Sequence, residues 1–224
     1  MKLRRFIILS SLSLHGLCSC NGLLFGIRNP RPISDDDIRR SAIRYHIPAA
    51  DLYCNKGTKL YYASLLQNKL GMHLLAKDHM QPLQAIYFDQ KGKMISWHIN
   101  CLAGGPMGSI NWNKEHRMDV FPPHTAAPPD TNIHFQSFYQ MLRPLSFPEK
   151  PSLEDHEYIV ILYWNDFMKR GSRKLIHTIR KNLLLAGTKS VKLLWVNNEN
   201  DFSNTNQMIT PAEQQWVENL FSTK

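Results

Sequence analysis

A strand–helix–strand pattern between Glu157 and Asn197 constrains the fold of this chain more than any other feature. Residues 158–164 are consecutive apolar or aromatic residues, as expected of a strand that is covered on both faces. The apolar residues that follow recur at three- and four-residue steps up to Gly187, which predicts an amphipathic helix that ends near this glycine. Residues 191–196 predict a second strand, and two strands joined by a helix of this length are parallel. The pattern therefore predicts an α/β domain.

The rest of the chain is expected to complete one domain, because 224 residues with 43% hydrophobic content can bury a single substantial core. Ser34 and the three aspartates after it predict a capped helix start and not a metal site. A long Gly- and Pro-rich loop is expected at 102–130. The other predicted elements are a strand at 50–54 and helices at 58–69, at 131–143 and from Thr210 onward.

A β-hairpin is predicted at 81–97, where two apolar runs flank a turn that contains Gly92. Pro82 precedes the first run, which ends in Phe-Asp and leads into a Lys-Gly-Lys turn. This pattern resembles the thioredoxin-like superfamily, in which the proline is cis and lies beside the active site. The strand at 158–164, which ends in Trp and leads into a helix, is similar to the first unit of that fold. The resemblance implies a thioredoxin-like mixed sheet flanked by helices.

The chain departs from that superfamily at its reactive centre. Asn165-Asp166-Phe167-Met168 stands where a thioredoxin has Cys-x-x-Cys, so dithiol chemistry is excluded there. Pro82, Asn165 and Met168 are the family-equivalent active-site positions. The hairpin also precedes the strand–helix–strand unit. Either the fold is permuted, or two half-units share one sheet, or the hairpin match is coincidental.

The first twenty residues predict an export signal. A basic start is followed by an apolar run too short to span a bilayer permanently. Leu17-Cys18-Ser19-Cys20 resembles the bacterial lipobox, which implies a signal peptide over 1–19 and a lipidated Cys20 that anchors the chain to the bilayer. Residues 20–33 are predicted to be a tether, followed by the domain at 34–224. The alternative is an ordinary secretory signal, with Cys20 a bystander.

Cys54 and Cys101 are the cysteines that keep a free side chain after such processing, because Cys18 is removed and Cys20 carries the lipid. Outside the cytoplasm, a pair of cysteines is more often a disulfide than a redox centre. Three interpretations stay open: a structural disulfide, two unpaired buried thiols, or a displaced redox site.

Composition argues against several other functions. Removing the three basic residues of the predicted signal leaves 24 Lys and Arg against 18 Asp and Glu, without a basic block, so nucleic acid is not an expected partner. His116, His124, His134 and His156 lack metal-ligand spacing, and we expect no metal or other cofactor. Asp166, near a helix start, could act as an acid or base, although capping is the commoner role. The basic residues of the helix between the two strands are most simply a solvated face.

These features together resemble a Bacteroidetes-like lipoprotein with a divergent thioredoxin-like domain. No acidic run directly follows Cys20, so the surface-export signal of some of these lipoproteins is not evident, and we expect an outer-membrane anchor that faces the periplasm. The expected function is a non-enzymatic binding or interaction module for an envelope protein or a small ligand, with no catalytic residue. The alternative is an envelope thiol–disulfide oxidoreductase that uses Cys54 and Cys101.

Overall fold

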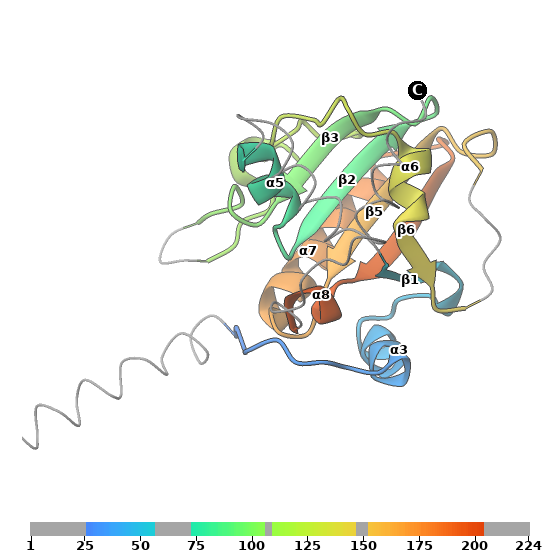
Figure 1. Cartoon of the computed structure of the whole chain (residues 1–224). Coiled ribbons are helices and arrows are strands. Elements are labelled where there is room, and N and C mark those ends of the chain that lie inside the picture. The colour runs from blue at the N-terminus through green and yellow to red at the C-terminus, as the bar shows by residue number, and fades with distance from the viewer. Residues whose placement is uncertain (1–25, 57–72, 106–108, 147–151, 204–224) are drawn as a thin grey trace, which may run out of the picture.

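A mixed six-stranded sheet forms the centre of the molecule (Figure 1), in a computed structural model that describes residues 26–56, 73–105, 109–146 and 152–203. The strands lie side by side in the order β3-β2-β5-β6-β1-β4. Their bounds are Leu52–Asn55 (β1), Gln84–Asp89 (β2), Met94–Ile99 (β3), Leu142–Pro144 (β4), Tyr158–Trp164 (β5) and Val191–Asn197 (β6).

The three central strands β5, β6 and β1 are parallel, and the outer strands are antiparallel to their neighbours. Trp164 at the end of β5 pairs with Asn197 at the end of β6, and Tyr53 of β1 pairs with Val196. The hairpin β2–β3 joins the free side of β5, where Ile86 pairs with Ile161 in antiparallel register. Strand β4 pairs antiparallel with β1 at the opposite edge. The predicted α/β class with a mixed sheet is confirmed.

Helices cover both faces of this sheet (Figure 1). Their bounds are Asp35–Arg44 (α3), His73–His79 (α5), Phe135–Gln140 (α6), Lys169–Leu184 (α7) and Glu199–Ser203 (α8), with short 3-10 turns at Ala49–Asp51 and Lys114–His116. One core cluster joins α3 and α7 to one face of the sheet. A second cluster joins α6 to the other face.

Local sequence explains the central unit. Ile159 to Trp164 are all at most 1% exposed, because β5 lies between two strands and is covered on both faces. Leu175, Ile176 and Ile179 of α7 are buried at helical spacing against that strand. The chain turns after α7 at Gly187, which has a φ of +63°, a conformation that favours glycine.

Two predicted elements differ from the structure. The helix predicted at 131–143 ends at Gln140, because Leu142 pairs with Asn55 and continues the chain as β4. The last part of the predicted tether, residues 26–33, is bound to the domain: Ile27 bridges Met168, and the Ile33 backbone hydrogen-bonds to Asn200. Helices α5 and α8 were not predicted. The helices expected at 58–69 and from 210 onward lie outside the described residues.

The long loop at 102–130 packs on the domain. Trp112 and Met118 are 4% exposed and belong to the core cluster on the α7 side of the sheet. The side-chain amide of Asn182 in α7 donates to the carbonyl oxygens of Met118 and Val120, at 2.8 and 2.6 Å. Within the described ranges, none of the helices has the length and apolar character needed to cross a membrane.

Candidate functional site

Polar residues gather at the carboxyl ends of β5 and β6. The two strands are parallel and in register at Trp164 and Asn197, so the residues that follow them lie together. Open parallel sheets bind ligands at this edge, just beyond the strand ends. Asn165 and Asp166 follow β5, and three polar residues occupy the corresponding place after β6 and at the start of α8 (Asn198, Glu199 and Asn200).

Asn165 joins the three positions that the sequence resemblance singled out. Its side chain is fully buried, and its Nδ2 donates to the Pro82 carbonyl oxygen and to Asn198 Oδ1, both at 3.0 Å. Its Oδ1 accepts the Met168 N–H at 2.9 Å, which orders the turn into α7. Asn198 Nδ2 also donates to the Pro82 carbonyl at 2.9 Å. Pro82 therefore lies beside Asn165 and Met168, although it is far from both in the sequence.

The peptide bond before Pro82 is not cis. Among the described residues, only Phe121–Pro122 is cis, so this implication of the resemblance is wrong. Ser172 supports the turn from the other side: its hydroxyl donates to the Asn165 carbonyl at 2.6 Å and accepts the Asn165 N–H at 3.1 Å. Ser172 is fully buried, so its hydroxyl serves as a structural link.

Asp166 fastens α3 to the end of β5. Its Oδ2 accepts hydrogen bonds from the Ser41 hydroxyl and from Arg44 Nη2, the latter at 2.8 Å. Its Oδ1 accepts the Tyr45 hydroxyl at 2.9 Å. Burial and the adjacent carboxylate raise the pKa of Tyr45, so this hydroxyl stays protonated and remains a donor. The expectation that Asp166 caps α7 is wrong, since Met168 is the N-cap residue and makes no side-chain cap bond.

Glu199 contacts the backbone of Asp166 from the start of α8. Only 2% of the residue is exposed, and its Oε2 accepts the Asp166 N–H at 2.6 Å. Burial raises the pKa of Glu199, while the bonds from the Asp166 and Phe167 backbone N–H groups oppose that change. This carboxyl group therefore orders the loop between β5 and α7.

A pocket of about 390 Å³ lies above these residues. One face of α3 forms the first wall of the pocket. The residues on this face are one or two helical turns apart: Asp37, Arg40, Ser41 and Arg44. The segment before α3, residues 28–33, forms the second wall, with Arg28 and Arg31 as its charged residues. Asp166 and Glu199 form the floor. Pockets in the range of several hundred Å³ are typical of small-ligand sites.

The two cysteines lie away from this pocket and from each other. Cys54 is buried in β1 and Cys101 is exposed after β3, and both are free thiols. Strands β2, β5 and β6 lie between them, a separation of roughly 19 Å at about 4.8 Å per strand. A disulfide needs Cα atoms within about 7 Å, so the candidate Cys54–Cys101 bond is not formed. Burial raises the pKa of Cys54 to about 11 and also raises that of Cys101.

No group of three or more metal-binding side chains gathers within the described ranges. The four histidines considered from sequence serve other roles or lie at the surface. His116 contacts Asp119 at 2.8 Å, His156 contacts Ser190 Oγ at 3.0 Å, and His134 is the N-cap residue of α6. His124 is exposed.

A second polar pair, His79 and Asp130, lies on the other side of the domain. His79 Nε2 is 2.9 Å from Asp130 Oδ2, and both side chains are fully buried. The His79 ring also packs on Trp97, with ring centroids 4.3 Å apart. Complete burial of both partners indicates a structural pair that links α5 to the loop before α6.

Sequence reasoning missed the pocket arginines and Glu199. The signal that could have found part of this wall is the recurrence of polar residues at 37, 40, 41 and 44, which share one helix face. The basic face of α7 was only partly a solvated surface: Arg180 Nη2 donates to the carbonyls of Tyr45 and His46, and the guanidinium lies 5.1 Å from the Trp195 ring centroid.

Comparison of the chain with protein-family models, with curated proteins and with solved structures finds no match.

Proposed function

We propose that this chain is a bacterial cell-envelope lipoprotein, anchored through an acylated Cys20, whose α/β domain acts as a non-enzymatic binding module. The observation that carries the proposal is the polar pocket at the carboxyl ends of β5 and β6. Open parallel sheets bind ligands at the carboxyl ends of their strands. The lipobox-like residues before Cys20 support the anchor, with the domain at the outer membrane facing the periplasm.

The finer fold in this proposal is a permuted thioredoxin-like domain. The hairpin β2–β3 and the unit β5–α7–β6 share one sheet, with β2 beside β5, as a permuted chain order requires. The hydrogen bond from Asn165 to the Pro82 carbonyl also supports it, because it joins the two family-equivalent positions. The trans peptide before Pro82 and the loss of both active-site cysteines are departures from that superfamily.

The competing function, a thiol–disulfide oxidoreductase, has less support. Disulfide exchange needs a thiolate, and the pKa values of Cys54 and Cys101 are both raised by burial. A reduced insulin-reduction rate in Cys54→Ser or Cys101→Ser, relative to an active wild-type protein, would establish this function and refute the proposal. We expect no thiol-dependent insulin reduction by the wild-type chain.

The anchor is tested by fractionation. Replacing Cys20 by Ala should release the protein from the membrane fraction and leave a larger precursor, because the thioether to the lipid needs this thiol. Cys18→Ala is the matched control and should be processed and anchored as wild type. A Cys20→Ala protein that is still processed and membrane-bound, or an unmodified mature N-terminus found by mass spectrometry, would contradict the lipoprotein assignment.

A further inference from the structure

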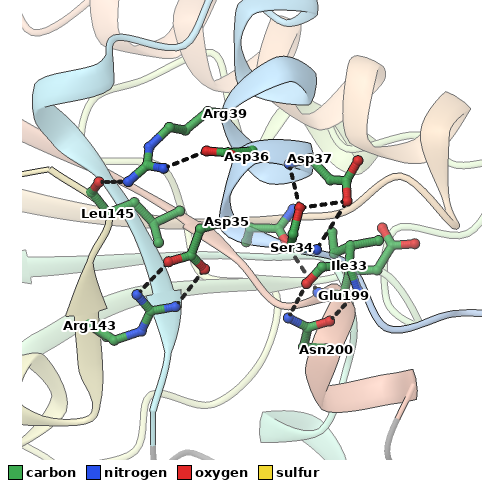
Figure 2. A network of polar contacts seen from close by, with 11 residues as sticks. Ile33, Ser34, Asp35, Asp36, Asp37, Arg39, Arg143, Leu145, Glu199 and Asn200 are labelled. Carbon is green, nitrogen blue, oxygen red and sulfur yellow. Dashed lines mark hydrogen bonds and ion pairs between the residues drawn. The ribbon is translucent and has the colours of Figure 1, made fainter.

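The pocket beside α3 depends on a segment that is fastened at both ends. At its start, the Arg28 N–H donates to the Phe167 carbonyl at 2.8 Å. At its end, Ile33 and Asn200 exchange two hydrogen bonds of 2.9 and 3.0 Å, as Figure 2 shows. The segment 28–33 is therefore a fixed wall of the pocket.

The three carboxylates of the pocket already have hydrogen-bond partners. Asp37 closes the capping box with Ser34 and also pairs with Arg40 Nη2 at 2.6 Å (Figure 2 shows the contacts with Ser34). Asp166 accepts bonds from the three α3-side donors described above, and Glu199 accepts backbone N–H groups. Little acceptor capacity is left to hold a cation or another donor.

The arginines, in contrast, retain donors. A guanidinium group has five N–H donors. Arg31 makes no hydrogen bond or ion pair with any residue that the structure describes, and Arg28 uses one side-chain nitrogen, Nη2, on the Asp166 carbonyl at 2.8 Å. Arg44 binds Asp166 and Ser41 through Nη2 alone, which leaves the donors on its other nitrogens. The unused hydrogen-bonding capacity of the pocket is thus cationic and donating.

We propose that this pocket binds its ligand through a phosphate group held by Arg28, Arg31 and Arg44. Guanidinium groups match phosphate oxygens with paired N–H donors. These arginines come from two separate walls, so a tetrahedral group with several oxygens can accept from both walls at once, whereas a planar carboxylate offers two oxygens. This assignment deepens the proposed binding function and rests on it.

The same phosphate chemistry could come from a soluble phosphate ester or from a phospholipid headgroup. Glycerol 3-phosphate and a water-soluble short-chain phosphatidic acid separate these sources, because they share the phosphate monoester and differ in the acyl chains. Equal affinity for the two assigns the site to a soluble ester. Tighter, Arg31-dependent binding of the phosphatidic acid assigns it to a headgroup.

Isothermal titration calorimetry of the full chain in non-ionic detergent, with inorganic phosphate at constant physiological ionic strength, tests the proposal. Arg31→Ala should weaken phosphate binding by at least about tenfold, because a hydrogen bond to a charged group is lost. The melting temperature should not change, since Arg31 has no partner among the described residues. Arg31→Lys should retain part of the affinity, because it keeps the charge and loses the paired donors.

Lys174→Ala is the matched control, since this exposed lysine of α7 is outside the pocket and the change removes the same charge. It should bind phosphate within about twofold of wild type, as expected for a screened surface charge. No saturable phosphate binding, or equal losses in the Arg31 and Lys174 variants, would overturn the assignment. The fractionation and insulin-reduction assays test the proposed function independently of phosphate. A failure of phosphate binding alone would therefore show a wrong ligand class and not a wrong function.

Discussion

Acidification should destabilise the domain through one buried histidine, His98 of β3. Only 2% of this residue is exposed, and its Nε2 lies 3.2 Å from the buried hydroxyl of Ser96. Burial lowers the pKa of His98 from 6.5 to about 4, and the positive charge of Arg117 acts in the same direction. The ring of Tyr87 also faces it, with centroids 6.3 Å apart.

The sign and size follow from the two pKa values. Between pH 6.5 and pH 4 the unfolded chain binds a proton at His98 that the folded chain does not bind. The contribution of the neutral His98 to the unfolding free energy is therefore fully present above pH 6.5 and is lost progressively as the pH falls to about 4. A difference of this size corresponds to about 3 kcal/mol of unfolding free energy, a large part of the roughly 5–15 kcal/mol typical of a domain.

Urea unfolding at a series of pH values measures this effect, with His98→Gln as the comparison. Other groups also titrate in acid: the pKa values of Asp35 and Asp119 are lowered and those of Asp78 and Glu199 are raised. These groups are present in both proteins, so the difference between the two curves isolates His98. Between pH 6.5 and 4 the wild-type unfolding free energy should fall more steeply by up to about 1.4 kcal/mol per pH unit.

Parallel curves for wild type and His98→Gln would refute the reasoning. So would an NMR titration in which the folded His98 protonates near pH 6.5. His124→Gln removes an exposed histidine and should follow the wild-type curve. A similar change in this control would show that the effect does not come from burial.

Five substitutions test the contacts around the site and the hairpin turn. Asp166→Ala should lower the unfolding free energy in urea by about 2–4 kcal/mol, because it leaves three donors without their acceptor. Tyr45→Phe removes one of these hydrogen bonds and should lower it by about 1 kcal/mol. Equal losses in the two variants would contradict this network. Gly92→Ala should lower the melting temperature more than Gly187→Ala. Both glycines have positive φ, but a Cβ at 92 would overlap the ring of His134, whereas no atom of the described residues lies within 4 Å of a Cβ at 187. Glu199→Gln should raise the unfolding free energy at neutral pH, because its raised pKa means that the charged form disfavours folding. This gain should vanish as the pH falls and the wild-type carboxyl becomes protonated, and a loss at neutral pH would show that the charge is needed.

Sequence periodicity predicted the elements whose stability is local or fully buried. The apolar run of β5, the amphipathic α7 and the hairpin β2–β3 lie where the patterns place them. The start of α3 is also correct, since Ser34 and Asp37 form a capping box. Each of these signals lies within a few neighbouring residues, so no knowledge of distant contacts was needed.

Long-range pairing overrode local propensity elsewhere. The predicted helix at 131–143 carries apolar residues at helical spacing, yet Leu142 lies in β4 because β1 offers an unpaired edge to it. The segment 26–33 has the composition of a linker, yet its backbone is held by Phe167 and Asn200. Composition cannot report such contacts, because their partners lie far away in the chain.

The site itself divides in the same way. The sequence by itself determined that the turn from β5 into α7, residues 165–168, carries no cysteine, because residue identity alone excludes a thiolate there. Only the tertiary structure decided that Cys54 and Cys101 stay apart and that arginines of α3 and of segment 28–33 surround one pocket. The physical reason is that parallel pairing of β5 with β6 brings the two strand ends together. Packing of α3 over them then buries polar groups, which must find hydrogen-bond partners there.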